Sequence, residues 1–81
     1  MRDTATLLVS GPDQKGLVAR VSEFIYRHQG NILHADQHTD LQAGMFLARM
    51  EWELNGFEIP RESIADHFRP VANALGLDFE V

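Results

Sequence analysis

Apolar residues along the chain follow two different periods, and the change of period separates helices from strands. Between Leu17 and His28 they recur three and four positions apart, which is the spacing of one face of a helix. This stripe consists of Leu17, Val18, Val21, Phe24, Ile25 and His28. A second stripe consists of Ile64, Phe68, Val71, Ala72 and Leu75. The pattern predicts two amphipathic helices, the second beginning near Pro60, continuing through Pro70 with a kink and ending at Gly76.

Four short segments have the pattern of β-strands. They are Thr4 to Ser10, Asn31 to Thr39, Met45 to Leu54 and Leu77 to Val81. Alternation is clearest in the third, where Phe46, Ala48, Met50 and Trp52 share one face and Arg49, Glu51 and Glu53 the other. Met45 and Leu47 fall on the polar face, so we expect that face to be partly covered. The order of elements predicts an α+β, ferredoxin-like βαββαβ sandwich, a four-stranded antiparallel sheet with two helices on one face.

The size of the chain limits its stability. With 81 residues it forms one small domain, and a domain of this size buries only about two-thirds of the surface that its unfolded chain exposes. It has no cysteine, so neither a disulfide nor a thiolate metal site can strengthen it. We therefore expect a dimer, or a neighbouring domain in a longer chain. The end at Val81, inside the last predicted strand, favours a piece of a longer protein.

The charge and hydropathy of the chain argue against two classes of partner. Twelve acidic and seven basic residues give a formal net charge of −5, and the basic residues are scattered. Nucleic-acid binding requires clustered cations, so it is disfavoured. No apolar run approaches the ~20 residues that span a bilayer, and the start lacks a signal peptide. We expect a cytoplasmic protein that binds neither nucleic acid nor membrane.

Turn-forming residues mark both ends of the first predicted helix. The segment from Gly11 to Gly16 connects the first strand to this helix, and Gly30 is predicted to take the left-handed position after it. Asp13 is expected to cap the helix, and Gly16, in its first turn, leaves the backbone open to close approach. The free donors there suit an anion such as a carboxylate, although ordinary capping of a tight turn explains the same residues equally well.

The four histidines do not form a metal site. His34 and His38 are about 13 Å apart on an extended strand, too far to share a metal ion. Together with Asp36 they form a polar row, which can bind a polar ligand or a partner but is more often a solvated face. His28 and His67 lie on or beside the helical stripes, and we expect them to be structural. There is no cysteine nucleophile and no G-x-S-x-G segment, so the residues predict no catalytic group, metal or cofactor.

The elements and their turn residues resemble a known family. A strand, then Asp13-x-x-Gly16-Leu17-Val18 opening an amphipathic helix, then Gly30-Asn31-Ile32 opening a second strand, is similar to the ACT domain. ACT domains sense small molecules, often amino acids, beside metabolic enzymes. The resemblance implies the same βαββαβ fold and a ligand-sensing role.

Further segments narrow the resemblance to one group of enzymes. Ser10 to Val18, Phe24-Ile25-Tyr26, Gly30-Asn31-Ile32-Leu33, Asp36-Gln37-His38 and Met50-Glu51-Trp52 resemble the N-terminal domain of bacterial formyltetrahydrofolate deformylases. In that family a separate downstream formyltransferase-like domain carries the H-x-S-x-L-P-x-F segment and the catalytic Asn, His and Asp, which have no counterpart here. The resemblance implies that residues 1–81 are a single ACT domain, the regulatory part of a hydrolase. That enzyme converts 10-formyltetrahydrofolate to formate and tetrahydrofolate, a step of one-carbon metabolism that supplies formate for purine biosynthesis.

The resemblance also implies a ligand site and a partner. Carried over residue by residue, the site consists of Asp13, Gln14, Lys15, Gly16 and Leu17 in the loop, with Asn31 and Ile32 across from it. Glycine and methionine are the effectors associated with the deformylase family. In ACT domains the site lies between two domains whose sheets align edge to edge, which implies a homodimer under allosteric control.

Two other functions compete with a sensing domain. The first is a free-standing ACT protein or an assembly module that holds other domains together and binds nothing small. The second is a small enzyme of the same sandwich class, such as an acylphosphatase. That enzyme needs an arginine in the first strand-to-helix loop to hold phosphate, and this loop has Lys15 instead, so the second alternative is disfavoured.

Overall fold

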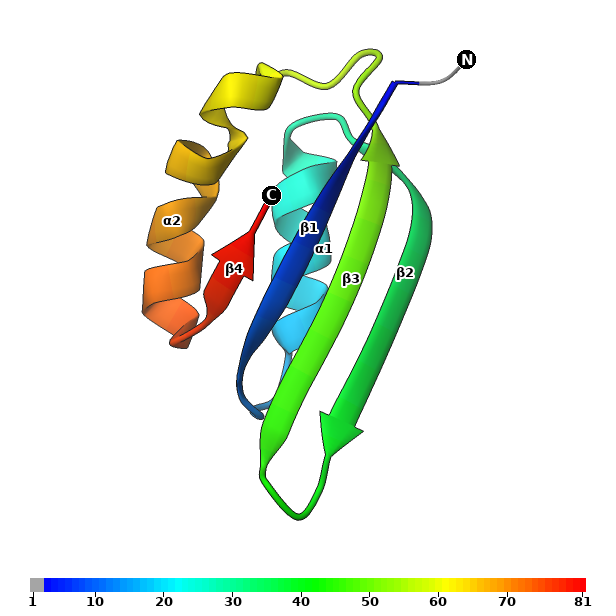
Figure 1. Ribbon diagram of the computed structural model, residues 1–81. Coiled ribbons are helices and arrows are strands. Elements are labelled where there is room, and N and C mark those ends of the chain that lie inside the picture. Colours follow the sequence, from blue (N-terminus) through cyan, green and yellow to red (C-terminus); the bar gives the residue numbers. More distant parts are fainter. Residues whose placement is uncertain (1–2) are drawn as a thin grey trace.

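The elements occur in the order that the periodicity predicts (Figure 1). The computed structural model describes residues 3–81, and Met1 and Arg2 lie outside the described residues. The elements are β1 (Thr4–Pro12), α1 (Leu17–Arg27), β2 (Asn31–Asp40), β3 (Met45–Glu53), the 3-10 turn η1 (Arg61–Ser63), α2 (Ile64–Leu75) and β4 (Asp78–Glu80). No helix in residues 3–81 is long and apolar enough to cross a membrane.

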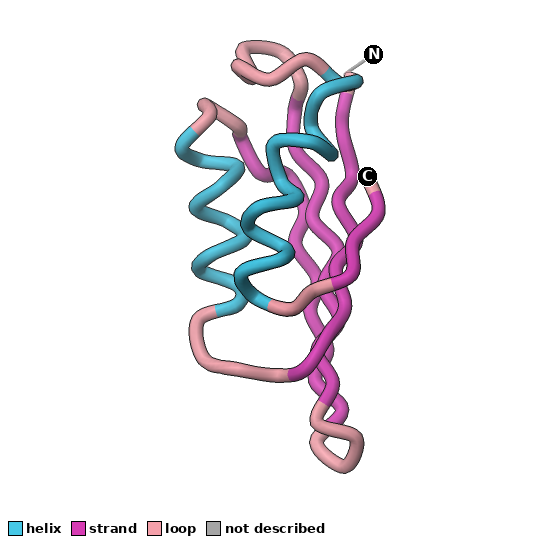
Figure 2. Tube along the Cα trace, turned by 90° about the vertical axis from the view of Figure 1, so that its left-hand side faces the viewer, coloured by secondary structure: helices cyan, strands magenta, loops and turns pink. Residues whose placement is uncertain are grey.

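The four strands form one antiparallel sheet in the order β2-β3-β1-β4, so β2 and β4 are its edges. Both helices lie on one face of this sheet, as Figure 2 shows, and no other element of residues 3–81 covers the opposite face. The predicted α+β sandwich is confirmed. The prediction that the polar face of β3 is partly covered does not hold for the single chain, where Met45 and Leu47 are 38% and 49% exposed.

The core lies between the sheet and the helices, and it consists largely of the apolar residues that the helical stripes and the strand alternation predict to be buried. Trp52, Phe24 and Phe68 are its largest members, and each is at most 1% exposed. The rings of Phe24 and Phe68 meet edge to face with their centroids 5.1 Å apart, which joins α1 to α2. The buried positions of β1 and β3 alternate along each strand, because successive side chains of a strand point to opposite faces. Burial therefore decides which face of every element turns inward.

Both helices end in the same hydrogen-bonded motif. After α1 the N–H of Gln29 donates to Tyr26 O and the N–H of Gly30 to Ile25 O, both at 2.9 Å, which is a Schellman ending. The left-handed residue is Gln29, with a φ of 69°, so the prediction that Gly30 takes this conformation was wrong. Gly30 is required for a different reason, since a Cβ on it would lie 2.9 Å from the carbonyl oxygen of Ile25. The prediction that Gly76 ends α2 is confirmed, with a φ of 70°.

β1 is longer than the sequence predicts. Gly11 and Pro12 were expected in a turn, but they continue the strand and pair with Phe46 and Met45 of β3. Gly11 fits there because the chain after α2 passes close to it. A Cβ on Gly11 would lie 2.9 Å from Gly76 O and 2.8 Å from the side chain of Leu77. The connection to α1 is therefore shorter than predicted.

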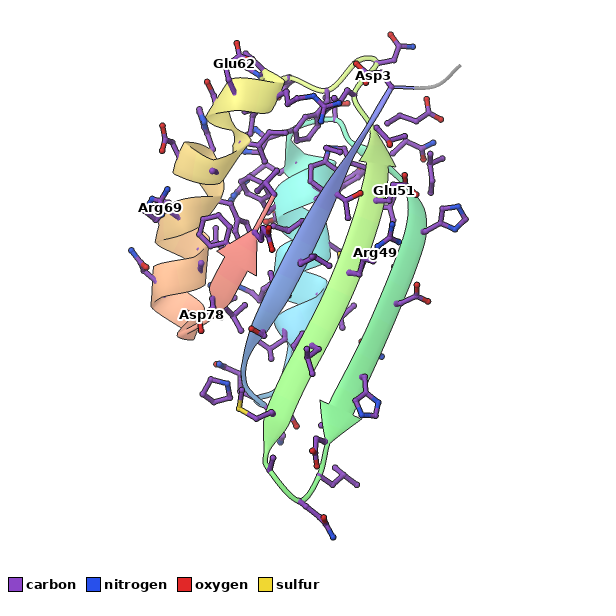
Figure 3. All side chains as sticks on the ribbon, in the orientation of Figure 1. Asp3, Arg49, Glu51, Glu62, Arg69 and Asp78 are labelled. Carbon is purple, nitrogen blue, oxygen red and sulfur yellow. The ribbon has the colours of Figure 1, made fainter. Side chains whose placement is uncertain are left out.

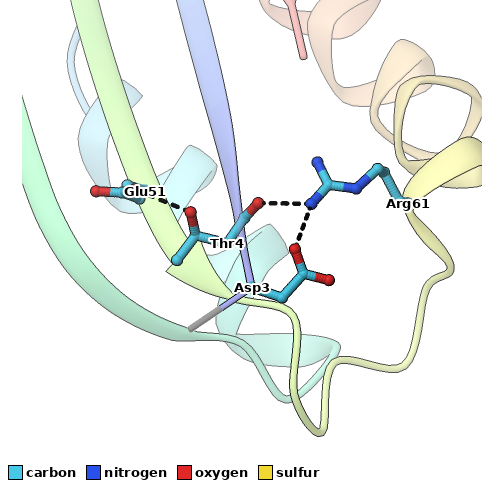
Figure 4. A network of polar contacts seen from close by, with 4 residues as sticks. All are labelled: Asp3, Thr4, Glu51 and Arg61. Carbon is cyan, nitrogen blue, oxygen red and sulfur yellow. Dashed lines mark hydrogen bonds and ion pairs between the residues drawn. The ribbon is translucent and has the colours of Figure 1, made fainter. Parts of the chain in front are cut away.

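The start of the second helical segment is fixed to the start of β1. Pro60 precedes η1, and α2 then runs through Pro70 as the unbroken stripe predicts. A guanidinium nitrogen of Arg61 donates to the carboxylate of Asp3 at 2.9 Å and to the carbonyl oxygen of Thr4 at 2.8 Å (Figure 4). The Thr4 hydroxyl in turn donates to Glu51 on β3 at 2.9 Å. These contacts join η1 to the sheet.

Candidate ligand-binding site

Helix α1 begins at the candidate loop without a side-chain cap. Its N-cap residue is Gly16, in the left-handed region at φ 82°, and its first turn contains no acidic residue. The prediction that Asp13 caps this helix was wrong, because Asp13 lies three residues before the N-cap position. Its backbone N–H donates instead to Gly44 O at 2.8 Å. Since the N-cap residue within the described part of the chain provides no side-chain cap, the first N–H groups of α1 can receive an anion.

The other loop residues have different surroundings. The side-chain amide of Gln14 donates to Leu75 O at 2.7 Å, which joins the loop to the end of α2. Lys15 is exposed, whereas the Leu17 side chain is only 2% exposed and belongs to the core. A ligand at this loop can therefore meet the ammonium of Lys15, the carboxylate of Asp13 and backbone donors. It cannot meet the side chain of Leu17.

Asn31 and Ile32 lie at the opposite end of the sheet from this loop. They pair with Glu53 and Trp52 at the end of β3, whereas the loop follows Pro12, which pairs with the first residue of β3. A strand advances about 3.3 Å per residue, so the two parts of the predicted site are roughly 25–30 Å apart within one chain. A single chain therefore does not bring them together.

A hollow beside the edge strand was not predicted from the sequence. It lies between the first turn of α1 and β2, has a volume of about 230 Å³, and is lined by Val18, Ala35, Asp36, Gln37 and Met50. Ala35 and Gln37 are exposed because the helices cover little of β2. The one signal for it in the sequence is the mixed polarity of Asn31 to Asp40, which lacks the apolar alternation of a strand packed on a core.

The histidines occupy structural or solvated positions, as predicted. The register places His34 and His38, with Asp36 between them, on the face of β2 away from the helices. The ring of His28 packs against Phe24 with centroids 5.2 Å apart, at the end of α1. The Nδ1 atom of His67 lies 2.8 Å from the carbonyl oxygen of Ser63. Within residues 3–81, no group of three or more His, Cys, Asp or Glu side chains is arranged to hold a metal ion.

Comparison with known families assigns the fold to a class. The family model of the ACT domain matches residues 5–73, so the chain belongs to the ACT domain family. The curated proteins that it resembles are formyltetrahydrofolate deformylases, and it matches their N-terminal regions. It is 49% identical over 78 residues to that of Synechocystis sp. and 35% identical over 80 residues to that of Bacillus subtilis.

Solved structures agree with the sequence comparison. The crystal structure of a formyltetrahydrofolate deformylase from Pseudomonas syringae superposes with a TM-score of 0.90 at 31% identity, and the match covers 99% of this chain and 26% of that one. The sequence match to the Synechocystis protein covers 96% of this chain and 28% of that protein. The sequence match to the Bacillus protein covers 98% of this chain and 27% of that protein. The chain thus spans little more than a quarter of the length of these relatives.

Proposed function

We propose that this chain is a regulatory, amino-acid-binding and dimerising domain of a formyltetrahydrofolate deformylase, located in the cytoplasm. The observation that carries the proposal is the uncapped start of α1 beside the unpaired outer edge of β2. The first supplies donors for an anion, and the second supplies a strand edge that another chain can pair with.

The distance between the two halves of the predicted site favours a site shared by two chains. If a second copy pairs antiparallel along β2, its Asn31 end lies next to the Asp40 end of the first copy. The loop that contains Asp13 and Gly16 is at that same end, because Asp40 and Pro12 both pair with Met45. Edge pairing therefore joins the loop of one copy to Asn31 and Ile32 of the other. The dimer would hold two such sites related by a two-fold axis.

The chemistry of this shared site suits an α-amino acid. The uncapped N–H groups of α1 can receive its carboxylate, and Asp13 can pair with its ammonium group. Asn31 of the partner subunit offers a donor and an acceptor. The hollow lined by Val18 and Met50 gives the amino-acid side chain an apolar wall. Glycine and methionine are the effectors to test, because the similarity to deformylases implies them.

The parent activity follows from similarity alone. Residues 1–81 would form the single regulatory domain, and a formyltransferase-like domain elsewhere in a longer protein would hydrolyse 10-formyltetrahydrofolate. The curated relatives support this arrangement, since each is more than three times as long as this chain. Binding of the effector between two regulatory domains would then change the activity of the hydrolase in its purine-biosynthetic context.

Calorimetric titration with glycine and methionine, together with sedimentation to determine the mass, tests the proposal. We expect a dimer and measurable heat, and at least about tenfold weaker binding for Asp13→Ala and for Asn31→Ala, since each removes a charged or paired hydrogen bond. Asp66→Ala, at an exposed position on α2, is the matched control and should bind normally. A dimer that gives no heat with any common amino acid would favour the assembly module.

Mixing the two variants tests whether the site is shared. In a dimer of one Asp13→Ala chain and one Asn31→Ala chain, one site has both native residues and the other has neither. Random pairing should therefore restore about a quarter of the wild-type sites, with wild-type affinity. If the mixture exchanges subunits but binds no better than either variant alone, both residues do not act in one shared site.

A further inference from the structure

The acidic charge of this chain lies on one face of the sheet. The face away from the helices, here called the outer face, carries six carboxylates and one guanidinium among the described residues. They are Asp36, Asp40, Glu51, Glu53, Asp78 and Glu80, with Arg49. Figure 3 labels Arg49, Glu51 and Asp78 among them. The helices and loops of residues 3–81 carry five cations against six carboxylates. The formal net charge of −5 therefore arises almost wholly on the outer face.

The two central strands of the outer face carry three exposed apolar side chains, and Arg49 in the middle of β3 lies beside them. Leu8, Met45 and Leu47 are 41%, 38% and 49% exposed there. Leu8 on β1 is diagonal to Leu47 on β3, because Leu8 pairs with Arg49, two residues beyond Leu47. A hollow of about 430 Å³ lies over this part of β3, β1 and β4, and its charged lining residues are Arg49, Asp78 and Glu80. The outer face thus combines apolar side chains on its two central strands with one guanidinium among them and carboxylates around them, and apolar side chains with charged surroundings are typical of a protein interface.

The sign of the charge decides what can cover this face. Two copies placed outer face to outer face would bring twelve carboxylates together with two guanidiniums, so a second copy is repelled. Nucleic-acid phosphates and anionic lipids are repelled for the same reason. Pairing of two copies along β2 would leave the face open, since strand pairing extends the sheet in its own plane. An occupant must therefore carry positive charge around an apolar centre.

We propose that the outer face is a docking surface for a partner protein whose contact patch has apolar side chains ringed by lysine and arginine. The Leu8, Met45 and Leu47 side chains provide the buried centre of the contact. The carboxylates of β2 and β4 on either side give the partner its orientation and attract it over a distance. This proposal does not depend on the amino-acid site, which lies at the edge of β2 and at the start of α1.

The test uses the whole 81-residue chain and a defined probe. The probe is an amphipathic helical peptide of leucine and lysine, and its counterpart with glutamate in place of lysine is the charge control. Binding to the isotope-labelled chain is followed by amide NMR shifts at low salt, where exposed charges are least screened. The variant Asp78→Asn/Glu80→Gln removes two carboxylates from the outer face, and Glu62→Gln/Asp66→Asn removes two from η1 and α2. Leu47→Ser is matched by Leu41→Ser, since Leu41 is 88% exposed in the hairpin turn.

If docking is specific to the outer face, each outer-face variant should bind the lysine peptide more weakly than its matched control variant does. The shifts should centre on Leu8, Leu47 and Glu80, and the glutamate peptide should not bind. The outer-face double variant should lose about fivefold in affinity and Leu47→Ser about tenfold, while both controls bind as the wild type does. Equal losses in the two double variants, or shifts centred on the helices, would overturn the proposal, because attraction to the overall charge would then explain the binding.

Discussion

Gly30 is one of two glycines, with Gly11, at which an added Cβ would lie less than 3 Å from other atoms, and Gly30→Ala tests whether this close packing requires glycine. The N–H of Gly30 donates to Ile25 O at 2.9 Å, which closes the end of α1. A Cβ on Gly30 would overlap the Cγ2 methyl of Ile25, and it would lie 2.9 Å from that same oxygen and 3.2 Å from the ring of Phe57. The oxygen cannot withdraw without breaking the hydrogen bond that ends the helix. The substitution therefore forces the helix end and the start of β2 apart.

The cost can be worked out from three contributions. Overpacking costs about 1–3 kcal/mol, and weakening the hydrogen bond to Ile25 costs about 1 kcal/mol more. Reduced freedom of the unfolded chain returns about 0.4–1 kcal/mol. The net loss is about 2 kcal/mol, out of the roughly 4–12 kcal/mol expected for a domain of this length. With a urea dependence of about 1 kcal/mol per molar, the unfolding midpoint should fall by roughly 2 M.

Urea unfolding can be followed by the fluorescence of Trp52, the single tryptophan, whose side chain is fully buried. Gly44→Ala is the matched control, because Gly44 has a φ of 66° and a Cβ there would meet no atom within 4 Å. That control should lose only about 1 kcal/mol, from backbone conformation alone. If Gly30→Ala loses no more than Gly44→Ala, the close approach to Ile25 is not what requires glycine.

Two further substitutions test neighbouring conclusions. Gln29→Gly should stabilise the chain by about 0.5 kcal/mol in the same urea experiment. Glycine removes the free-energy cost of the left-handed φ of 69°, and this gain exceeds the loss from the larger conformational entropy of the unfolded chain. A loss of stability would contradict this reasoning. Arg61→Gln should cost about 0.5–1 kcal/mol, because it removes the hydrogen bonds to Asp3 and Thr4. Part of that loss should disappear in about 1 M salt, where the screening length is about 3 Å, and a loss independent of salt would mean that the ion pair contributes nothing.

Periodicity was enough to predict the fold because burial acts on whole faces. The stripe that includes Val21 and Phe24 and the alternation that includes Met50 and Trp52 each bury a single face, and tertiary packing preserved both. The turn-forming residues were less informative, because a position can require glycine either for a left-handed φ or for the close approach of other atoms. Gly30 is required by the proximity of Ile25, not by its own φ, and a pattern of residue types cannot distinguish these reasons.

The candidate site was harder to predict because it depends on the residue at which α1 begins and on how the helices pack on the sheet. The segment containing Asp13 reads as a capping segment, yet only the structure places the N-cap at Gly16. The predicted element order already implies that Asn31 and the loop lie at opposite ends of the sheet, because the helix between them begins at the loop and ends before Asn31, and the register of β2 on β3 agrees. The hollow beside Ala35 arises because the helices leave β2 partly uncovered, which is a property of packing and not of any local motif.

A site divided between two chains couples ligand binding to pairing. If the loop of one copy and Asn31 of the other both contact the amino acid, the ligand binds only the dimer well. Linkage then requires that the ligand strengthens the dimer by the same factor by which dimerisation strengthens ligand binding. A small domain without disulfides is suited to such coupling, because an unpaired β2 edge can gain stability from a partner. The outer face stays open in the pair, because strand pairing extends the sheet in its own plane.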